Sequence, residues 1–353
     1  MSQKSLGTLK RIILIIVGLI FEIGVVYLVI SWNRPINPAL EIPDHTSEEP
    51  RETLTDNVNE ETENQSGEII QPTLEPVCGG PPTLTVLVTG VASKDYLYGL
   101  ADAIRVARID FQTQKVTVLA LPRDLWIEIP GLDDRGITVG KLNQAYFYGT
   151  EGMGYYSGAG FGSGLLAESL FLNFGLAVDH YLSVSLNSFR KIINTLGGVD
   201  VYLPQDVYKR VNDQPVLFLK AGSHHLNGKQ AEMLARQRIS IGDFGRINNQ
   251  TILLKAIAVQ ILSPSGIAAI PPIVEQVQSN VLMDFSPAEI TQLICLAGMI
   301  DFQEDIKFVS IPQDLMIEQM VYDPARGINT AALVSDEDKI LVLINNFHTG
   351  IWP

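Results

Sequence analysis

Metal ligands and reactive thiols are scarce in this sequence. Its 353 residues include two cysteines and five histidines, and their spacing does not suit zinc, which takes clustered Cys and His ligands. A Cys–His nucleophilic site has no support beyond the presence of both residue types. Two positions, Cys78 and Cys295, cannot by themselves establish a disulfide. Because Cys295 lies in the apolar run ITQLICLAGM, we expect a buried, inert thiol there.

Excess positive charge is also lacking. The formal net charge is -14 at pH 7, whereas domains that bind nucleic acid are typically basic. We therefore predict no nucleic-acid partner and expect any anion-binding site to be local. Internal repeats and a second linker are absent as well, so residues 77–353 are expected to form one domain.

The first 76 residues fall into three segments of contrasting composition. Residues 1–11 are basic, residues 12–32 are almost wholly apolar, and residues 33–76 hold 11 acidic and 2 basic residues. The apolar segment is long enough to cross a bilayer, and the positive charge before it places the N-terminus inside. A cleaved signal peptide is the alternative, but it would be shorter and end at a small-x-small site.

This composition predicts a single-pass protein of the cell membrane. We expect a cytoplasmic tail at residues 1–11, a transmembrane anchor at 12–32, a disordered acidic linker at 33–76 and an extracytoplasmic domain at 77–353.

Hydrophobic periodicity predicts strands and helices in alternation after residue 77, which indicates an α/β layer fold. The segment Gly149–Gly164 is rich in glycine and tyrosine and is either a lid or a plain long connection. Strands are predicted at 84–88, 104–109, 116–121, 126–129, 180–184 and 199–203, and helices at 165–174, 187–196, from Asn227 to Arg236, from Ile247 to Pro264, and after Ser286 and Ser335.

The stretch ARQRISIGDFGRINNQ, Ala235–Gln250, concentrates arginine in an acidic protein. Arginine binds phosphate through paired hydrogen bonds and keeps its charge. We predict that the chain leaves one helix, turns at Gly242 and begins another, so that Arg236, Arg238 and Arg246 converge. Two alternatives remain open: local ion pairs on a solvated surface, and a capping role for Asp243 at the new helix.

Three further residues fit an anion site. Arg123 follows a predicted strand, at the edge where α/β sheets collect ligands. Lys141 begins a predicted helix, where a cation is unfavourable, and an anionic ligand beside it would remove that misfit. Asp102 stands just before the strand at 104–109 and could hold a divalent cation or accept a proton.

These motifs together resemble the LytR-CpsA-Psr family of cell-envelope proteins. The resemblance runs from about Leu84 to about Leu254 and rests on VLVTGV, ADAIRV, LPRD, GKLNQAY, DHYLSVSLNSFRKIINTLGGVDVYLP, GSHHLNGKQAEMLARQR and GDFGRINNQ. It implies an α-β-α sandwich around a mixed sheet. It also implies a phosphotransferase that moves a glycopolymer from a polyprenyl-pyrophosphate lipid to peptidoglycan, with Mg²⁺.

The resemblance also assigns roles to residues. It implies that Asp102 and Asp243 serve as metal ligand or base, with Asp102 on the metal and Arg246 in the catalytic set. The residues implied to surround the pyrophosphate are Arg123, Lys141, Arg236, Arg238, Arg246 and Gln250.

Two positions depart from the family pattern. Ala92 stands where the family usually has Asp, and Leu100 where it usually has Arg. The alternative function is therefore an envelope protein that binds such lipids with little or no transfer, unless nearby Lys94 and Asp95 substitute. Residues 267–353 lie outside the strongest resemblance, and we expect them to pack into the same domain.

Overall fold

In the computed structural model, the described residues are 31–40, 74–239, 242–263, 266 and 281–352. The anchor predicted at residues 12–32 lies outside them except for its last two residues, and so do residues 41–73 of the linker predicted at 33–76. Among the described residues, no helix combines the length and the apolar character needed to span a bilayer.

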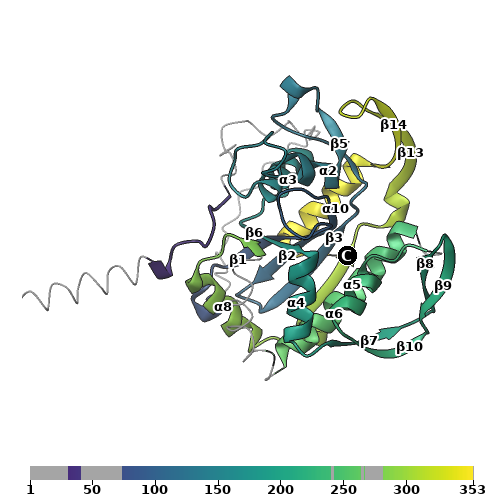
Figure 1. The fold of residues 1–353 in the computed structure, drawn as a ribbon. Coiled ribbons are helices and arrows are strands. Elements are labelled where there is room, and N and C mark those ends of the chain that lie inside the picture. The colour runs from purple at the N-terminus through teal and green to yellow at the C-terminus, as the bar shows by residue number, and fades with distance from the viewer. Residues whose placement is uncertain (1–30, 41–73, 240–241, 264–265, 267–280, 353) are drawn as a thin grey trace, which may run out of the picture.

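A six-stranded sheet runs through the middle of the molecule (Figure 1). Its strands are β1 Thr83–Val91, β2 Ala101–Asp110, β3 Lys115–Leu121, β6 His180–Ser185, β11 Val281–Met283 and β12 Ile306–Ser310. Their order is β11-β6-β1-β2-β3-β12. The β1–β6 and β3–β12 pairs are parallel and the other three are antiparallel. The prediction of an α/β fold around a mixed sheet is confirmed.

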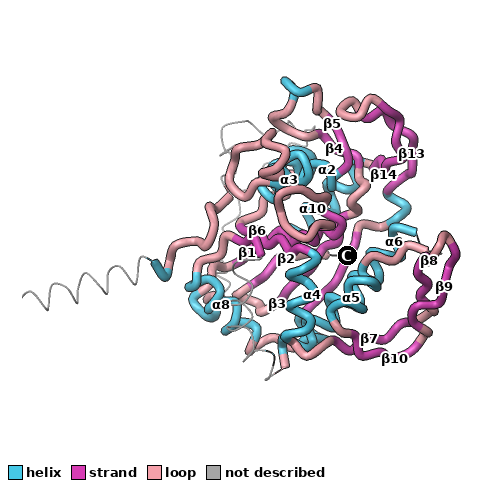
Figure 2. The backbone as a smooth tube through the Cα atoms, in the orientation of Figure 1, coloured by secondary structure: helices cyan, strands magenta, loops and turns pink. Residues whose placement is uncertain are grey.

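Helices cover both faces of this sheet (Figure 2). One face carries α2 Leu142–Tyr148, α3 Gly162–Phe174 and α10 Glu337–Thr349, and the other carries α4 Leu186–Thr195, α5 Gly228–Ala235, α6 Gly242–Leu262 and α8 Pro287–Ala297. The remaining elements are the hairpins β4 Trp126–Glu128 with β5 Val139–Lys141, β7 Val199–Leu203 with β10 Gly222–Leu226, β8 Val207–Val211 with β9 Gln214–Leu219, and β13 Met316–Asp323 with β14 Ile328–Ser335, the helix α9 Phe302–Asp305, and 3-10 turns at Val77–Gly79, Asp133–Arg135 and Gln313–Leu315.

Alternation along the central strands decides what each face buries. Leu87 on β1, Ile104 on β2 and Leu119 on β3 are fully buried against α2, α3 and α10. Val88 and Arg105, the next residues on β1 and β2, point to the opposite face. The described segment after residue 280 supplies both outer strands of the sheet and α10.

The strand predicted at 199–203 does not join the central sheet, as strand–helix alternation would suggest. It forms β7, which pairs with β10 in a separate two-stranded sheet. Gly197 and Gly198 have φ of 82° and 103°, a conformation that favours glycine, and they turn the chain away from the sheet. β7 then buries one side only, as its alternating burial pattern shows.

Helix starts follow the predicted capping residues closely. The Asn227 side chain accepts a hydrogen bond from the Gln230 N–H at 3.0 Å, and Ser286 caps α8 in the same way. For α10, however, the cap is Asp336 and not Ser335, because β14 continues through Ser335.

The expectation of an inert thiol at Cys295 is wrong. Cys78 and Cys295 form a disulfide with a Cα–Cα distance of 5.8 Å, which ties the turn before β1 to α8. Cys295 is also exposed, whereas its neighbour Leu296 is buried. Sequence could not reveal the pairing, because the two cysteines are 217 positions apart.

The start of the predicted linker contacts the domain. The Ile36 N–H donates to the Phe285 carbonyl oxygen at 3.1 Å, and Asn37 Nδ2 donates to the Met283 carbonyl oxygen at 2.6 Å. Leu40 packs against the core beside α3. Residues 33–40 therefore lie along the domain and are not a free tether.

Candidate functional site

A glycine turn between two helices brings the arginines of Ala235–Gln250 together. α5 ends at Ala235 with Arg236 as its C-cap. Gly242 has φ of 64°, the left-handed conformation that glycine adopts without strain, and α6 begins there. The predicted arrangement of two helices around a turn is confirmed at these described residues.

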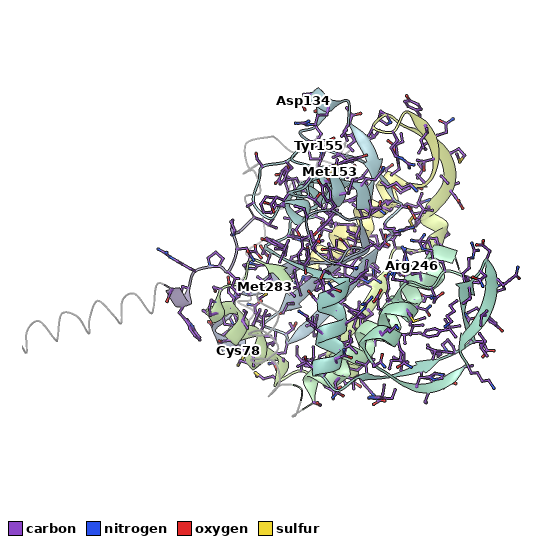
Figure 3. All side chains as sticks on the ribbon, viewed as in Figure 1. Cys78, Asp134, Met153, Tyr155, Arg246 and Met283 are labelled. Atoms are coloured by element: carbon purple, nitrogen blue, oxygen red, sulfur yellow. A yellow bond between two sulfur atoms is a disulfide. The ribbon has the colours of Figure 1, made fainter. Side chains whose placement is uncertain are left out.

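Asp102 and Asp243 lie at the centre of three arginines. Asp102 accepts a hydrogen bond from Arg123, and Arg123 Nε lies 3.4 Å from Asp243 Oδ1. Arg246 Nη2 lies 2.8 Å from the same Asp243 oxygen. Arg238 lies 3.9 Å from Asp102 and 3.8 Å from Asp243. We call these five residues the arginine cluster; Figure 3 places its Arg246 far from Cys78.

Asp243 faces the arginines although it lies in the first turn of α6. Both of its carboxylate oxygens lie within 3.0 Å of Arg246 Nη2. Asp102 Oδ2 and Asp243 Oδ1 both accept no hydrogen bond from the described residues. They differ in their distance to the nearest arginine, because Asp102 Oδ2 lies 3.9 Å from Arg238 and from Arg246, whereas Asp243 Oδ1 lies 2.8 Å from Arg246 Nη2. Asp102 therefore has an oxygen free for a ligand, whereas Asp243 fixes Arg246.

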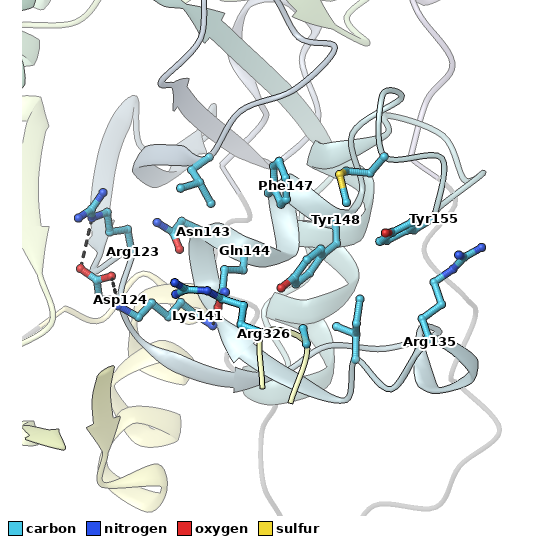
Figure 4. Close-up of a pocket in the computed structure, with 14 residues that line it drawn as sticks. Arg123, Asp124, Arg135, Lys141, Asn143, Gln144, Phe147, Tyr148, Tyr155 and Arg326 are labelled. Atoms are coloured by element: carbon cyan, nitrogen blue, oxygen red, sulfur yellow. Dashed lines mark hydrogen bonds and ion pairs between the residues drawn. The ribbon is translucent and has the colours of Figure 1, made fainter. Parts of the chain in front are cut away.

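Lys141 has an anionic partner within the protein. Its Nζ donates to Asp124 Oδ1 at 2.9 Å, and Asp124 also lies 3.3 Å from Arg123 (Figure 4). This pair already removes the misfit of a lysine at the start of α2, so that position does not by itself require an anionic ligand. Burial alone would raise the pKa of Asp124, but the hydrogen bond from Lys141 and the charge of Arg123 outweigh it and lower that pKa.

Arg105 belongs to the site, and sequence analysis missed it. It is 3% exposed and donates to the carbonyl oxygens of Ile104 and Ile247 and to Gln250 Oε1. The amide of Gln250 in turn donates to the Asp102 carbonyl oxygen at 3.4 Å. A signal was present in the motif ADAIRV, because an arginine between apolar residues of a central strand must have a buried partner or a ligand.

Arg236 lies farther out. Its Nη1 is 3.1 Å from Glu232, a buried carboxylate that also pairs with Arg190 of α4. The Arg236 side chain is 59% exposed. Of the predicted pyrophosphate ligands, Arg123, Arg238 and Arg246 therefore meet directly, Gln250 joins them through Asp102, and Arg236 stands at the rim.

An apolar cavity of about 480 Å³ opens beside the arginine cluster. It lies between the sheet and helices α4, α5 and α6, with Val88, Leu182, Phe189 and Ile257 among its lining residues. Asp102, Arg105, Arg236, Arg238, Arg246 and Gln250 also line it. The cavity thus combines an apolar lining with four arginines, Arg105, Arg236, Arg238 and Arg246.

The site carries more positive than negative charge. Seven cationic side chains meet four acidic ones, an excess of three positive charges: Arg105, Arg123, Lys141, Arg190, Arg236, Arg238 and Arg246 against Asp102, Asp124, Glu232 and Asp243. Burial lowers the pKa of Arg246 to about 10 despite the attraction of Asp243. Burial and the charge of Arg246 likewise lower the pKa of Arg105 to about 10. A bound anion would relieve this repulsion.

The two departures from the family pattern border different spaces. Ala92 lines the apolar cavity, and its N–H donates to the Leu100 carbonyl oxygen at 2.9 Å. The Leu100 side chain lines a second pocket on the far side of Arg123. Asp95 accepts a hydrogen bond from the Leu97 N–H within its own loop, and neither Asp95 nor Lys94 lines the cavity.

The carboxylates of the site are too few to hold Mg²⁺ by themselves, so the residues fit this ion only if a bound diphosphate supplies further ligands. Asp102 Oδ2 is free, but no group of three or more His, Cys, Asp or Glu side chains among the described residues could hold a metal. Mg²⁺ is commonly bound by one or two carboxylates together with substrate phosphates. Asp102 with a diphosphate would match that pattern.

Known proteins share this sequence pattern. The model described as the LytR_cpsA_psr family matches residues 46–323. TagV of Bacillus subtilis (strain 168), named a polyisoprenyl-teichoic acid–peptidoglycan teichoic acid transferase, is 31% identical over 187 residues, 52% of this chain and 44% of TagV. MsrR of Staphylococcus aureus (strain COL), named a regulatory protein, is 26% identical over 232 residues, 65% of this chain and 64% of MsrR. The matched part of this chain spans less than two thirds of either relative.

The fold is shared with a solved structure as well. The crystal structure of B. subtilis TagV matches with a TM-score of 0.60 at 25% identity, covering 77% of this chain and 98% of that chain. The family model spans well over half of the sequence, and the arginine cluster lies within the matched residues. The chain is thus a member of the LytR_cpsA_psr family.

Proposed function

We propose that this chain is a membrane-anchored phosphotransferase that moves a glycopolymer from a polyprenyl-pyrophosphate lipid to peptidoglycan. One observation carries the proposal: an apolar cavity of about 480 Å³ that is also lined by the buried guanidinium groups of Arg105 and Arg246. An amphiphile with a long apolar tail and a highly charged anionic head matches both parts. A free sugar phosphate would leave the apolar interior empty, and a neutral lipid would leave the arginines uncompensated.

The relatives point to the same chemistry. TagV is named for the transfer of teichoic acid from a polyisoprenyl carrier to peptidoglycan. MsrR is named a regulatory protein, a name that specifies no reaction. The charge and apolar lining of the site suit a lipid diphosphate, which both the transferase and the lipid-binding alternative require, so the transferase name of TagV favours the first.

The transfer reaction would proceed at the phosphorus nearer the glycan. A hydroxyl oxygen of the acceptor attacks this phosphorus and forms a new P–O bond. The bond to the bridging oxygen of the pyrophosphate breaks, and polyprenyl phosphate leaves. Arg123, Arg238 and Arg246 would stabilise the charge that develops on the phosphoryl oxygens. Asp102 or Asp243 would accept the hydroxyl proton. Because Asp102 Oδ2 would also hold Mg²⁺, Asp243 would take this role when the ion is bound.

Mg²⁺ belongs to this proposal as a cofactor. Asp102 would hold it together with the diphosphate, and the ion would supply further charge neutralisation at the phosphoryl oxygens. Ala92 provides no second carboxylate, so the protein contributes little beyond Asp102 to metal affinity. We accordingly expect a high Mg²⁺ requirement for transfer.

The membrane anchor at residues 12–32 completes the proposed organisation. A polyprenyl tail is confined to the bilayer, so a tethered domain meets its substrate at the membrane surface. The basic tail at residues 1–11 would stay in the cytoplasm and the domain from residue 77 outside. Peptidoglycan, the proposed acceptor, lies on that same outer side.

The test uses the full chain in lipid nanodiscs with a polyprenyl-pyrophosphate glycan, a peptidoglycan oligomer and Mg²⁺. We expect phosphodiester-linked product from the wild type, and at least a tenfold loss of prenyl pyrophosphate affinity in Arg238→Ala, since charge-assisted hydrogen bonds contribute about 1.5–3 kcal/mol. Arg210→Ala, on exposed β8, is the matched control and should change nothing. Unchanged affinity in both Arg236→Ala and Arg238→Ala would contradict the phosphate-binding role.

A substitution at Ala92 distinguishes the transferase from the lipid-binding alternative. If the missing carboxylate limits chemistry, Ala92→Asp should raise the transfer rate and lower the Mg²⁺ concentration needed. A wild type that binds the lipid but transfers nothing, together with an active Ala92→Asp variant, would identify the natural protein as a binding protein. Equal transfer rates in the wild type and in Ala92→Asp would show that the missing carboxylate does not limit transfer.

A further inference from the structure

A second pocket of about 700 Å³ begins on the other side of Arg123. We call it the aromatic pocket, defined by Phe147, Tyr148, Tyr155, Arg135 and Arg326. Figure 4 shows it extending from Arg123, Asp124 and Lys141 at one end to Tyr155 and Arg135 at the other. Its volume falls within the range of small-molecule sites, about 300–1,000 Å³.

Ring surfaces line one end of this pocket. Tyr148 and Tyr155 are nearly parallel, with ring centroids 6.5 Å apart, and Phe147 is tilted against Tyr148 at 5.7 Å. Such rings offer flat apolar surfaces with polar edges. A pyranose ring has a matching apolar face of C–H bonds and hydroxyl groups around its rim.

The pocket also holds cations without acidic partners. The Arg135 guanidinium stacks over the Tyr155 ring at 4.3 Å from its centroid. Neither Arg135 nor Arg326 forms an ion pair with any residue that the structure describes. Arginine is suited to carboxylate and phosphate groups, so the pocket favours a ligand that carries negative charge.

A buried amide oxygen decides what kind of anion fits. Asn143 is 3% exposed, lines the pocket, and its Oδ1 has no hydrogen-bond partner among the described residues. Its backbone N–H donates to the Arg123 carbonyl oxygen at 3.0 Å, which fixes it beside the arginine cluster. A buried acceptor needs a donor. A phosphate dianion offers acceptors only, whereas a sugar hydroxyl or an N-acetyl N–H would donate to Asn143.

From these observations we propose that the aromatic pocket binds a saccharide unit bearing a carboxylate or phosphate group. The sugar ring lies on Tyr148 and Tyr155, its anionic group pairs with Arg326 or Arg135, and one donor reaches Asn143 Oδ1. This inference rests on the proposed function, because the pocket that would hold the sugar is also lined by Arg123, where the phosphoryl group would be held. Both the transferred glycopolymer and the acceptor glycan are sources of such a unit.

The test measures binding of lipid-free glycans to the full chain in detergent by ligand-observed saturation-transfer NMR. The probes are a β-1,4-linked hexosamine tetrasaccharide with lactyl carboxylates, a phosphodiester-linked glycosylated polyol oligomer, and a neutral N-acetylglucosamine tetramer. We expect one of the two anionic probes to bind and the neutral one to bind at least fivefold more weakly, from the charge-assisted hydrogen bonds it lacks. The anionic probe that binds identifies the source as acceptor or as transferred polymer.

Variants then locate the binding site. Tyr155→Ala and Arg326→Ala should each weaken saccharide binding roughly tenfold, while Tyr202→Ala on exposed β7 and Arg210→Ala are matched controls that should not. Prenyl pyrophosphate affinity should stay unchanged in the Tyr155 and Arg326 variants and fall in Arg238→Ala. If no anionic probe binds, if the neutral glycan binds equally well, or if both pocket variants keep full affinity, the saccharide site is overturned. Unchanged prenyl pyrophosphate affinity in Arg238→Ala would count against the proposed function alone.

Discussion

The two faces of the central sheet come from the same strands but are packed in opposite ways. On one face, Leu87, Ile104 and Leu119 are fully buried against α2, α3 and α10. On the other, Val88 and Arg105 border a cavity that α4, α5 and α6 leave open. The first face has the close packing that stabilises a fold. The second retains unfilled space and buried charge, so it is suited to binding.

The difference between the two faces arises from alternate residues of the same strands. Successive residues of a strand point to opposite faces, so Ile104 joins the core while Arg105 faces the cavity. A substitution should therefore act on stability at one position and on ligand affinity at the next. Four experiments test that division.

The largest effect is expected from a matched pair of leucines on the neighbouring strands β1 and β6. Leu87→Ala, on the packed face, should lower the free energy of unfolding by about 3–4 kcal/mol, because it leaves a void among fixed side chains. Leu182→Ala, on the cavity face, should cost about 1 kcal/mol or less, because its side chain already borders open space. Urea unfolding of the full chain measures both. Equal losses would contradict the division.

Removal of the disulfide tests whether α8, which packs on the cavity face of the sheet, contributes to stability or to ligand binding. Breaking the bond between Cys78 and Cys295, which are 217 positions apart, should lower the free energy of unfolding by about 2–4 kcal/mol through the added freedom of the unfolded chain. The double variant Cys78→Ser with Cys295→Ser should keep wild-type affinity for prenyl pyrophosphate. Reducing the wild type with dithiothreitol is the control, and loss of affinity in either case would show that α8 supports the site.

Arg105→Met should separate stability from binding most sharply. Arg105 is a buried cation with no acidic partner in hydrogen-bond contact among the described residues. Replacing such a charge by an apolar side chain of similar size is expected to leave stability unchanged or raise it by about 1 kcal/mol. Prenyl pyrophosphate affinity should fall roughly tenfold.

Arg108→Met on the same strand is the matched control for that variant. Arg108 pairs with Asp110 at 3.2 Å and donates to the His348 carbonyl oxygen. Its loss should lower stability and leave affinity intact. If Arg105→Met destabilises the protein as Arg108→Met does, the cost attributed to the buried charge is contradicted.

The smallest effect concerns the pH dependence of stability at the β6–β11 edge. His180 lies 3.3 Å from Asp284 and 3.2 Å from Glu289, with Asp179 nearby. Burial opposes its charge, but the close contact with Asp284 and the charges of Glu289 and Asp179 outweigh burial and raise the pKa of His180. Its stabilising contribution is thus complete below the unfolded value of about 6.5 and is lost as pH rises through the folded pKa. Melting temperatures between pH 5 and 8 should fall more in the wild type than in His180→Gln; parallel curves would contradict this.

Local features were predictable because their causes lie within a few residues. The turn at Gly242, the cap at Asn227 and the Ser286-Pro287 start of α8 each depend on backbone geometry and nearby side chains. The composition of the arginine stretch predicts an anion site but leaves local ion pairs open. Arg105 was missed because its role depends on Gln250, which is 145 positions away.

Sequence by itself determined the strands up to residue 203, several helices, the concentration of guanidinium groups and the family pattern, because each follows from neighbouring residues or from motif order. The strands after residue 203 were not predicted. Only the tertiary structure decided which carboxylate keeps a free oxygen, that Asp124 neutralises Lys141, and that Cys78 meets Cys295. It also decided that α4, α5 and α6 leave a cavity beside the arginines. These outcomes depend on how distant segments pack in space, and the free energy of that packing is a property of all the contacting surfaces together.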